Sequence, residues 1–273
     1  MTASFEMDAA AGGRLSEFKV GGYQIIFNDK TEDPLAWGAY PMVPFAGRVE
    51  NGRFNFGDRS YQLPINLGEH SIHGNAFTSN WNAASPEELQ LELDGRWPLG
   101  GSVVHGGSLT RPDECGRDGS GRLELALTVT ATTHSMPAMV GWHPWFNRRL
   151  TPEGPSAQVV VPNFQDAEMY EVGSDMIPTG RLVSPPDPGP WDHPFRKMEQ
   201  PIEISWPGQL KLELSSTCDH WVIYDHLEHA LCVEPQSGPP NVFNPERFDV
   251  RPDVLQPGET LSHTFGIEWE LLQ

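Results

Sequence analysis

Proline and glycine interrupt this chain so often that a bundle of long helices is excluded. The sequence contains 27 glycines and 26 prolines among its 273 residues, and they are distributed along its whole length. Proline breaks the interior of a helix and glycine weakens it. Nine tryptophans and thirteen phenylalanines supply large apolar surfaces for a core, and such rings also stack on sugars. We therefore expect an all-β fold.

Several segments alternate apolar and polar residues with the period of two that marks a half-buried strand. The clearest runs from Leu123 to Ala131, and the alternation recurs at 210–214 and 261–271. Shorter segments lie at 23–27, 89–93 and 221–224, with turn signals at Asn51-Gly52, Gly57-Asp58 and Pro207-Gly208. Many short strands separated by close turns favour a sandwich or a barrel.

The length fits one large β domain or two small ones. The proline-rich stretch SPPDPGPWDHP, residues 184–194, resembles a linker, but strand-like patterning continues on both sides of it. We therefore expect a surface loop within a single domain that spans residues 1–273, with two domains divided at this stretch as the alternative. Residues 1–14 are expected to be poorly ordered.

The charge balance restricts the classes of ligand. Eighteen lysines and arginines oppose 37 acidic residues, which gives a formal net charge of −19. Nucleic-acid binding needs a basic surface, so we expect no nucleic-acid partner, and phosphorylated substrates are disfavoured for the same reason. The N-terminal segment lacks the basic start and apolar run of a signal peptide, and no run has the length of a membrane span. We expect a cytoplasmic protein.

The cysteines and histidines give no clear metal motif. Cys115, Cys218 and Cys232 include no Cys-x-x-Cys pair, which argues against a disulfide framework and a structural zinc site. The sets at 70–73 (HSIH) and 226–229 (HLEH) contain paired histidines, but residues three apart in a strand point to opposite faces. We expect these histidines to lie at the surface or in loops.

Polar and aromatic residues concentrate in three parts of the chain: PFAGRVENGRF (44–54) with HSIHGNAF (70–77), GWHPWFNR (141–148), and CVEPQSGPPN (232–241). His143 and Glu234 each precede a proline, which favours extended backbone, so each is expected at the end of a strand facing a cleft. Taken alone, a histidine flanked by tryptophan is more often a packed structural residue. A glutamate after an apolar strand is more often a surface residue.

Taken together and in this order, the segments resemble the aldose 1-epimerase, or galactose mutarotase, family. The resemblance rests on the Arg48 segment, IHGN, WHPWFN, IPTG at 177–180, WDHPF and VEPQSGPPN, and it extends from PFAGR to the C-terminal strand. It implies a large antiparallel β-sandwich of the galactose mutarotase-like supersandwich type, with an open sugar cleft and no cofactor. It also implies an isomerase that interconverts the anomers of an aldohexose such as galactose or glucose.

Individual residues match the family's functional positions. His143 matches the general acid and Glu234 the general base. His73 in IHGN, Arg48, and Asp192 in WDHPF match residues that bind the sugar. The resemblance therefore implies two catalytic residues and three substrate-binding residues, with no metal.

The implied reaction opens and recloses the hemiacetal ring. A base removes the proton of the C1 hydroxyl while an acid protonates the ring oxygen, and the pair works in reverse after rotation about C1–C2. We expect Glu234 and His143 on opposite sides of the anomeric centre. The family's asparagine before the arginine is replaced by Gly47, which puts the identity of the sugar in doubt.

Three alternatives remain at this stage. A glycoside hydrolase needs a second carboxylate, for which Asp192 is the candidate. A hexose-6-phosphate epimerase needs basic residues near the phosphate, and the candidates are Arg48, Arg53, Arg148 and Arg149. A non-catalytic sugar-binding or regulatory protein needs neither an acid nor a base. No coiled-coil repeat or distinct interface segment indicates an oligomeric state.

Overall fold

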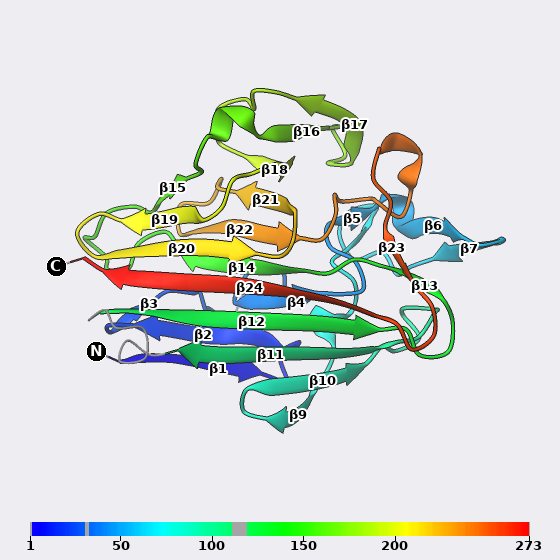
Figure 1. Ribbon diagram of the computed structural model, residues 1–273, viewed down its shortest axis with the longest axis horizontal. Helices are drawn as coiled ribbons and strands as arrows, with labels where there is room; N and C mark the ends of the chain where they lie inside the picture. The colour runs from blue at the N-terminus through cyan, green and yellow to red at the C-terminus, as the bar shows by residue number, and fades with distance from the viewer. Residues whose placement is uncertain (1, 31–32, 111–118, 273) are drawn as a thin grey trace.

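The computed structural model describes residues 2–30, 33–110 and 119–272, and it consists almost entirely of β-structure (Figure 1). Two large antiparallel sheets form the body of the molecule, with one sheet in front of the other in the view of Figure 1. The expected all-β, antiparallel sandwich is therefore confirmed. Among the described residues, no helix is long and apolar enough to cross a membrane.

The first sheet carries the strands that build the candidate site. Its path runs β1 (Ala3–Asp8), β2 (Arg14–Val20), β4 (Ala39–Met42), β14 (Gly141–Asn147), β22 (Ala230–Gln236), β21 (His220–Tyr224), β18 (Asp192–Arg196), β16 (Glu168–Val172) and β17 (Pro178–Val183), and β3 (Tyr23–Gln24) pairs with β2. Strands β14 and β22 lie near the middle of this path, although they are far apart in the sequence.

The second sheet supplies the other layer. Its order is β15 (Gln158–Val160), β19 (Ile202–Trp206), β20 (Leu210–Ser216), β24 (Thr260–Leu271), β12 (Ser120–Thr130), β11 (Ser102–Thr110), β10 (Glu88–Glu92) and β9 (Asn82–Ser85). Smaller pairs are β5 (Arg48–Val49) with β8 (Ser71–Ile72), β6 (Arg53–Phe56) with β7 (Arg59–Gln62), and β13 (Met136–Ala138) with β23 (Asp253–Leu255). Short 3₁₀ turns occur at Glu50–Gly52, Ala76–Thr78, Phe164–Asp166 and Pro245–Arg247.

The period-two alternation predicted the long strands of the second sheet and one strand of the first sheet correctly. In β12 the leucines at 123, 125 and 127 are fully buried, and β12 pairs with β24 so that Leu125 lies opposite Phe265. The segments at 210–214, 221–224 and 89–93 coincide with β20, β21 and most of β10. The segment at 23–27 is strand only at Tyr23–Gln24 and continues as a single bridge between Ile26 and Phe146.

Side chains from both sheets belong to one hydrophobic cluster. This supports one domain rather than two divided at 184–194, because Asp192–Arg196 form β18 inside the first sheet. The expectation of poor order for residues 1–14 does not hold for Ala3–Asp8. These residues form β1 and pair with β2, because Phe5 and Met7 alternate with polar residues and pack against the core.

Alternation along the central strands separates a core face from an outer face. Trp142 of β14 contacts His105 and Phe265 of the second sheet, and Trp221 of β21 also contacts Phe265. Because successive side chains of a strand point to opposite faces, His143 must face away from the second sheet. The same rule places the side chains of Val222 and Tyr224 on the outer face.

Candidate active site

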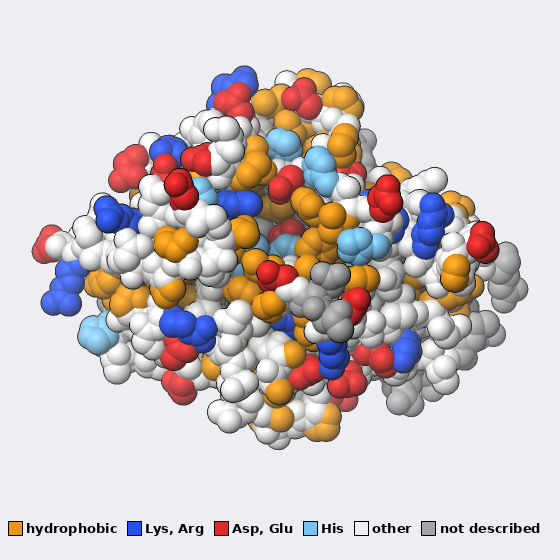
Figure 2. All heavy atoms as spheres, turned by 180° about the vertical axis from the view of Figure 1, so that it is seen from behind, with side chains coloured by type: hydrophobic (Ala, Val, Ile, Leu, Met, Phe, Trp, Pro, Cys, Tyr) orange, Lys and Arg blue, Asp and Glu red, His pale blue; other side chains and the backbone are white. Residues whose placement is uncertain are grey.

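A pocket of about 430 Å³ lies on the outer face of the first sheet. In Figure 2 this face is hollowed, and acidic and histidine side chains are visible in the hollow. The floor comes from β4, β14, β22, β21 and β18, and the walls come from the segments around residues 33–36, 47–48, 67–73 and 172–176. The pocket brings together all five residues that the sequence singled out, namely Arg48, His73, His143, Asp192 and Glu234.

His143 and Glu234 both line the pocket and are in direct contact. Strands β14 and β22 pair Gly141 with Gln236 and Trp145 with Cys232, and this register sets His143 opposite Glu234. His143 Nε2 and Glu234 Oε1 are 3.2 Å apart. The expectation that they flank the anomeric centre from opposite sides is therefore wrong, because cross-strand partners on one face are neighbours.

Burial gives this pair an unusual electrostatic state. Burial raises the pKa of Glu234 well above its ordinary value, the charge of Asp192 adds to this effect, and the hydrogen bond from Gln236 opposes it. Burial lowers the pKa of His143 to about 3, and the positive charge of Arg14 acts in the same direction. Both shifts favour the uncharged form of each group, so we infer that the pair holds a single proton, which resides mainly on Glu234, over a wide pH range.

Aromatic rings fix the orientation of the His143 imidazole. Tyr40 stacks on it with a centroid separation of 4.8 Å and an interplanar angle of 22°, and Trp145 lies 5.1 Å away. The Tyr40 hydroxyl and the Trp145 indole N–H both donate to the carbonyl oxygen of Leu35, at 3.2 and 2.8 Å. The loop that forms one wall of the pocket is thereby tied to both rings. Ring packing of this kind leaves Nε2 directed at Glu234.

His73 has a defined tautomer. The backbone N–H of Gly47 donates to His73 Nδ1 at 3.1 Å, and the backbone N–H of His73 donates to the Gly47 carbonyl at 3.0 Å. Burial lowers the pKa of His73 well below its ordinary value, and the charges of His143 and Arg48 add to this effect. His73 is therefore neutral with its proton on Nε2, which leaves one N–H donor for a bound ligand.

The backbone conformation at position 47 and the neighbouring Pro240 explain why this residue is a glycine. Gly47 has a φ of 66°, and a Cβ added there would lie 2.5 Å from the Cβ of Pro240. A residue with a side chain cannot occupy this position unless Pro240 moves. The departure from the family's asparagine is therefore accompanied by a proline that fills the space beside it.

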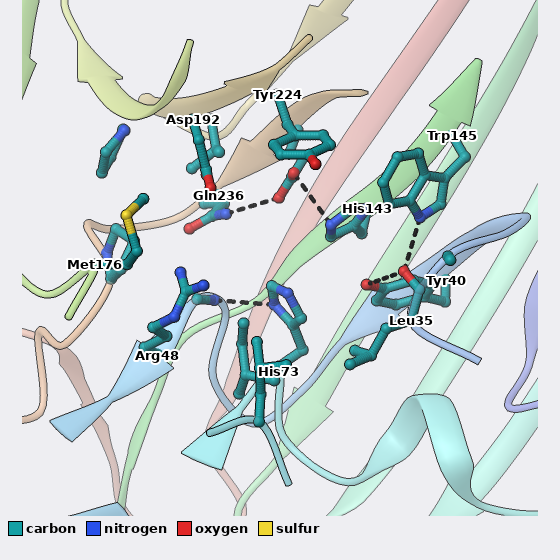
Figure 3. Close-up of a pocket in the computed structure, with 18 of the residues that line it drawn as sticks. Leu35, Tyr40, Arg48, His73, His143, Trp145, Met176, Asp192, Tyr224 and Gln236 are labelled. Atoms are coloured by element: carbon teal, nitrogen blue, oxygen red, sulfur yellow. Dashed lines mark hydrogen bonds and ion pairs between the residues drawn. The ribbon is translucent and has the colours of Figure 1, made fainter. Parts of the chain in front are cut away.

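Arg48 and Asp192 extend the polar lining on either side of the central pair. Arg48 lies in β5, and its guanidinium has no hydrogen-bond or ion-pair partner in the part of the chain that the structure describes. Asp192 is the first residue of β18 and lies opposite Tyr224 of β21. Both side chains are therefore available to a ligand (Figure 3).

Sequence reasoning missed several lining residues. Gln236 donates from Nε2 to Glu234 Oε2 at 3.2 Å, and the spacing of two along β22 would have placed it on the same face. Trp145 follows His143 by the same spacing. Tyr40 and the wall formed by Asp33, Leu35 and Ala36 carried no sequence signal.

The remaining candidate arginines do not reach the pocket. The Arg148 guanidinium donates to the backbone carbonyls of Asp225 and Leu227, at 2.7 and 2.9 Å. Arg149 donates to the Gly154 carbonyl, and Arg53 donates to the side chain of Gln62. Among the described residues, Arg48 is the only arginine or lysine that lines the pocket.

The paired histidines of the sequence do not form metal sites in the described chain. His70 and His73 lie in loops, as expected, since both are outside the named strands, and they are buried there: His70 Nδ1 accepts a hydrogen bond from the Asn51 N–H, and His73 faces the pocket. His229 packs on the ring of Phe27. The described residues contain a different cluster of metal-ligating atoms, formed by His143, Cys232 and Glu234. Cys218 is a free, buried thiol, and Cys115 lies outside the described residues.

Two curated proteins of Escherichia coli K12 resemble this chain over most of its length. The uncharacterized protein YphB is 26% identical over 257 residues, which cover 84% of this chain and 83% of YphB. The uncharacterized protein YihR is 27% identical over 267 residues, which cover 85% of this chain and 80% of YihR.

Solved structures share the fold. A putative aldose 1-epimerase of E. coli K12 superposes with a TM-score of 0.76 at 20% identity and covers 99% of both chains. A galactose mutarotase-like protein of Clostridium acetobutylicum has a TM-score of 0.78 at 18% identity, covering 99% of this chain and 92% of the other. A galactose 1-epimerase of Lactobacillus acidophilus has a TM-score of 0.73 at 16% identity, covering 97% and 90%.

These solved structures are too distant in sequence to assign a family, but a family model does assign one. The model of the family described as aldose 1-epimerase matches residues 9–268, which include every strand that contributes to the pocket floor. The chain therefore belongs to the aldose 1-epimerase family.

Proposed function

We propose that this protein is an aldose 1-epimerase that interconverts the α and β anomers of a free aldohexose. The observation that carries the proposal is the contact between His143 Nε2 and Glu234 Oε1, buried at the centre of a pocket of suitable size. An acid and a base in contact, sharing one proton, are the groups that opening and closing a hemiacetal requires.

The geometry suits the reaction because the C1 hydroxyl oxygen and the ring oxygen are bonded to the same carbon. Two adjacent groups on one side of the sugar therefore reach both oxygens. The reaction starts from the form of the pair in which the shared proton has moved to His143. Glu234 then takes the proton of the C1 hydroxyl, and His143 delivers its proton to the ring oxygen as the C1–O5 bond breaks. Rotation about C1–C2 presents the other carbonyl face, and ring closure returns both protons. Each such proton transfer contributes roughly 10²–10⁴-fold to the rate.

The remaining lining residues supply contacts to the sugar hydroxyls. The guanidinium of Arg48 and the Nε2–H of His73 donate hydrogen bonds, and the carboxylate of Asp192 accepts them. The rings of Trp145 and Tyr224 supply apolar surface for the faces of the sugar, as aromatic side chains do in many sugar sites. No step of this mechanism calls for a metal or an organic cofactor.

The charge of the pocket favours an unphosphorylated sugar. Arg48 is the only cationic side chain among the described lining residues, and it is outnumbered by the carboxyl groups of Asp33, Asp192 and Glu234. A phosphate group bears about two negative charges and is usually held by several basic groups. This supports a free aldohexose over a hexose 6-phosphate.

Polarimetry tests the proposal directly. Freshly dissolved α-glucose and α-galactose should approach equilibrium rotation faster in the presence of the protein, and their 6-phosphates should respond much less. Equal or greater acceleration of the 6-phosphates would assign the phosphorylated substrate instead. Binding of galactose by calorimetry without any acceleration would identify a sugar-binding protein, and release of an aryl leaving group from a glycoside would identify a hydrolase.

A further inference from the structure

The thiol of Cys232 lies beside the His143–Glu234 pair and has no part in the proposed proton transfer. One ligand atom from each of the three residues lies within 4.8 Å of the other two. Cys232 and Glu234 are two residues apart on β22 and therefore share a face, while His143 projects from the neighbouring strand. Three different metal-ligating groups thus converge at the floor of the pocket.

The surroundings of Cys232 shield the thiol from bulk solvent. Its partners across the two neighbouring strands are Trp145 and Tyr224, and the rings of these residues meet edge to face at a centroid separation of 5.7 Å. Cys232 is fully buried, and its thiol makes no hydrogen bond with the described residues. His143 and Glu234 line the pocket, so a small ion can reach the cluster from that side.

The donor set fits zinc. Imidazole nitrogen, thiolate sulfur and carboxylate oxygen are its common ligands, at about 2.0–2.3 Å, so tetrahedral ligand atoms lie roughly 3.3–3.8 Å from one another. The 3.2 Å between His143 Nε2 and Glu234 Oε1 is just below this range. A spacing of up to 4.8 Å for the thiol requires a shift of about 1 Å.

Charge also favours the ion. A thiolate and a carboxylate together cancel the two charges of Zn²⁺, so the buried complex is neutral and avoids the cost of an unpaired buried charge. The protein's net charge of −19 raises the local concentration of cations around it. Hard cations such as Mg²⁺ prefer oxygen ligands and do not suit this set.

We propose that His143, Cys232 and Glu234 form a binding site for a thiophilic divalent cation, Zn²⁺, whose occupancy blocks the acid–base pair. Zinc binding is argued from the three ligands alone, whereas the loss of activity on zinc binding rests on the proposed function. Coordination to the ion occupies the lone pairs of His143 Nε2 and the Glu234 carboxylate, so these groups can no longer exchange protons with the sugar. Each zinc displaces the thiol proton of Cys232 and the single proton held by the pair, so two protons are released.

Cobalt titration tests the site without any sugar assay. Co²⁺ added to the full chain should develop a thiolate-to-cobalt charge-transfer band at one equivalent, and Zn²⁺ should abolish the band by displacement. Cys232→Ser should lose the band and bind Zn²⁺ at least about tenfold more weakly, because a thiolate ligand is removed. Cys218→Ser, which alters a buried cysteine outside the pocket, and Cys115→Ser should keep both.

Further measurements distinguish a failure of the zinc proposal from a failure of the proposed function. Calorimetry in buffers of different ionisation enthalpy should show two protons released per zinc, and galactose should weaken zinc binding. If Cys232→Ser unfolds, as circular dichroism would show, Cys232→Ala serves in its place. Equal zinc affinity in wild type and a folded Cys232 variant, or no thiolate band, would overturn the proposal. A wild type that binds zinc through Cys232 but does not accelerate mutarotation would instead overturn the proposed function.

Discussion

His105 should make the stability of this protein depend on pH in a way that a single substitution removes. It is fully buried in β11, with Nδ1 2.8 Å from the Gly13 carbonyl and Nε2 accepting a hydrogen bond from the Trp142 indole at 3.0 Å. The neutral ring with its proton on Nδ1 satisfies both contacts, whereas a proton on Nε2 would break the second. Burial lowers the pKa of His105 to about 4, against an ordinary value of 6.5.

The sign and size follow from linkage between proton binding and folding. Between pH 6.5 and 4 the unfolded chain binds a proton at this residue that the folded protein excludes, so stability falls as the pH falls. At 1.36 kcal/mol per pKa unit, the loss relative to neutral pH is about 2 kcal/mol at pH 5 and about 3 kcal/mol at pH 4. Above pH 6.5 the residue contributes almost no pH dependence.

Urea unfolding of wild type and His105→Gln, followed by tryptophan fluorescence, measures this effect. Glutamine offers a donor and an acceptor but does not titrate. From pH 7 to pH 4 the free energy of unfolding of wild type should therefore fall by about 3 kcal/mol more than that of the variant. The other buried histidines are common to both proteins and cancel. A difference that stays constant with pH would refute the reasoning.

Two matched pairs of variants test the pocket. Gly57→Ala should lower the free energy of unfolding by only about 1 kcal/mol, because Gly57 has a φ of 57° but open space around it. Gly47→Ala should lower it by roughly 1–3 kcal/mol more, because the added Cβ collides with Pro240. Thermal unfolding gives the comparison, and equal losses would contradict the contact. Arg48→Ala should raise KM for the sugar about tenfold or more, because a donor in the pocket is lost, whereas Arg53→Ala, on a residue that binds Gln62, should leave KM unchanged. Steady-state polarimetry decides, and an unchanged KM in Arg48→Ala would remove Arg48 from the binding site.

The sequence predicted those parts of the fold that depend on local pattern. Alternation identified β12, β20 and β24, since a half-buried strand records its exposed and buried faces in its own residues. The strand at Ala3–Asp8 was missed, because residues 1–14 were expected to be poorly ordered although Ala3, Phe5 and Met7 alternate with polar residues there. The pattern left a sandwich and a barrel open, and the family resemblance decided for the sandwich.

The candidate residues were identified by motif, but their arrangement was not. The contact between His143 and Glu234 depends on the register between β14 and β22, which lie far apart in the sequence and form no hairpin. Such a register is decided by the packing of the whole sheet. Tyr40 and the wall around Leu35 were missed for the same reason, because only tertiary structure brings them to the pocket.

The arginines show the opposite error. Arg148 lies beside the WHPWFN motif, and its position in the sequence suggested a phosphate ligand. In the structure its guanidinium is occupied by backbone carbonyls of the loop that precedes β22. A sequence does not reveal whether a guanidinium is already saturated by the backbone, so its charge alone is a poor guide to ligand chemistry.

The central claim is that the buried His143–Glu234 pair transfers the protons of ring opening. The most direct measurement is the polarimetric rate for α-galactose and α-glucose with wild type, Glu234→Gln and His143→Asn, each shown to be folded by circular dichroism. The account predicts that wild type accelerates mutarotation and that each variant lowers kcat by roughly 10²–10⁴-fold. A folded Glu234→Gln protein that retains a near wild-type rate would contradict it.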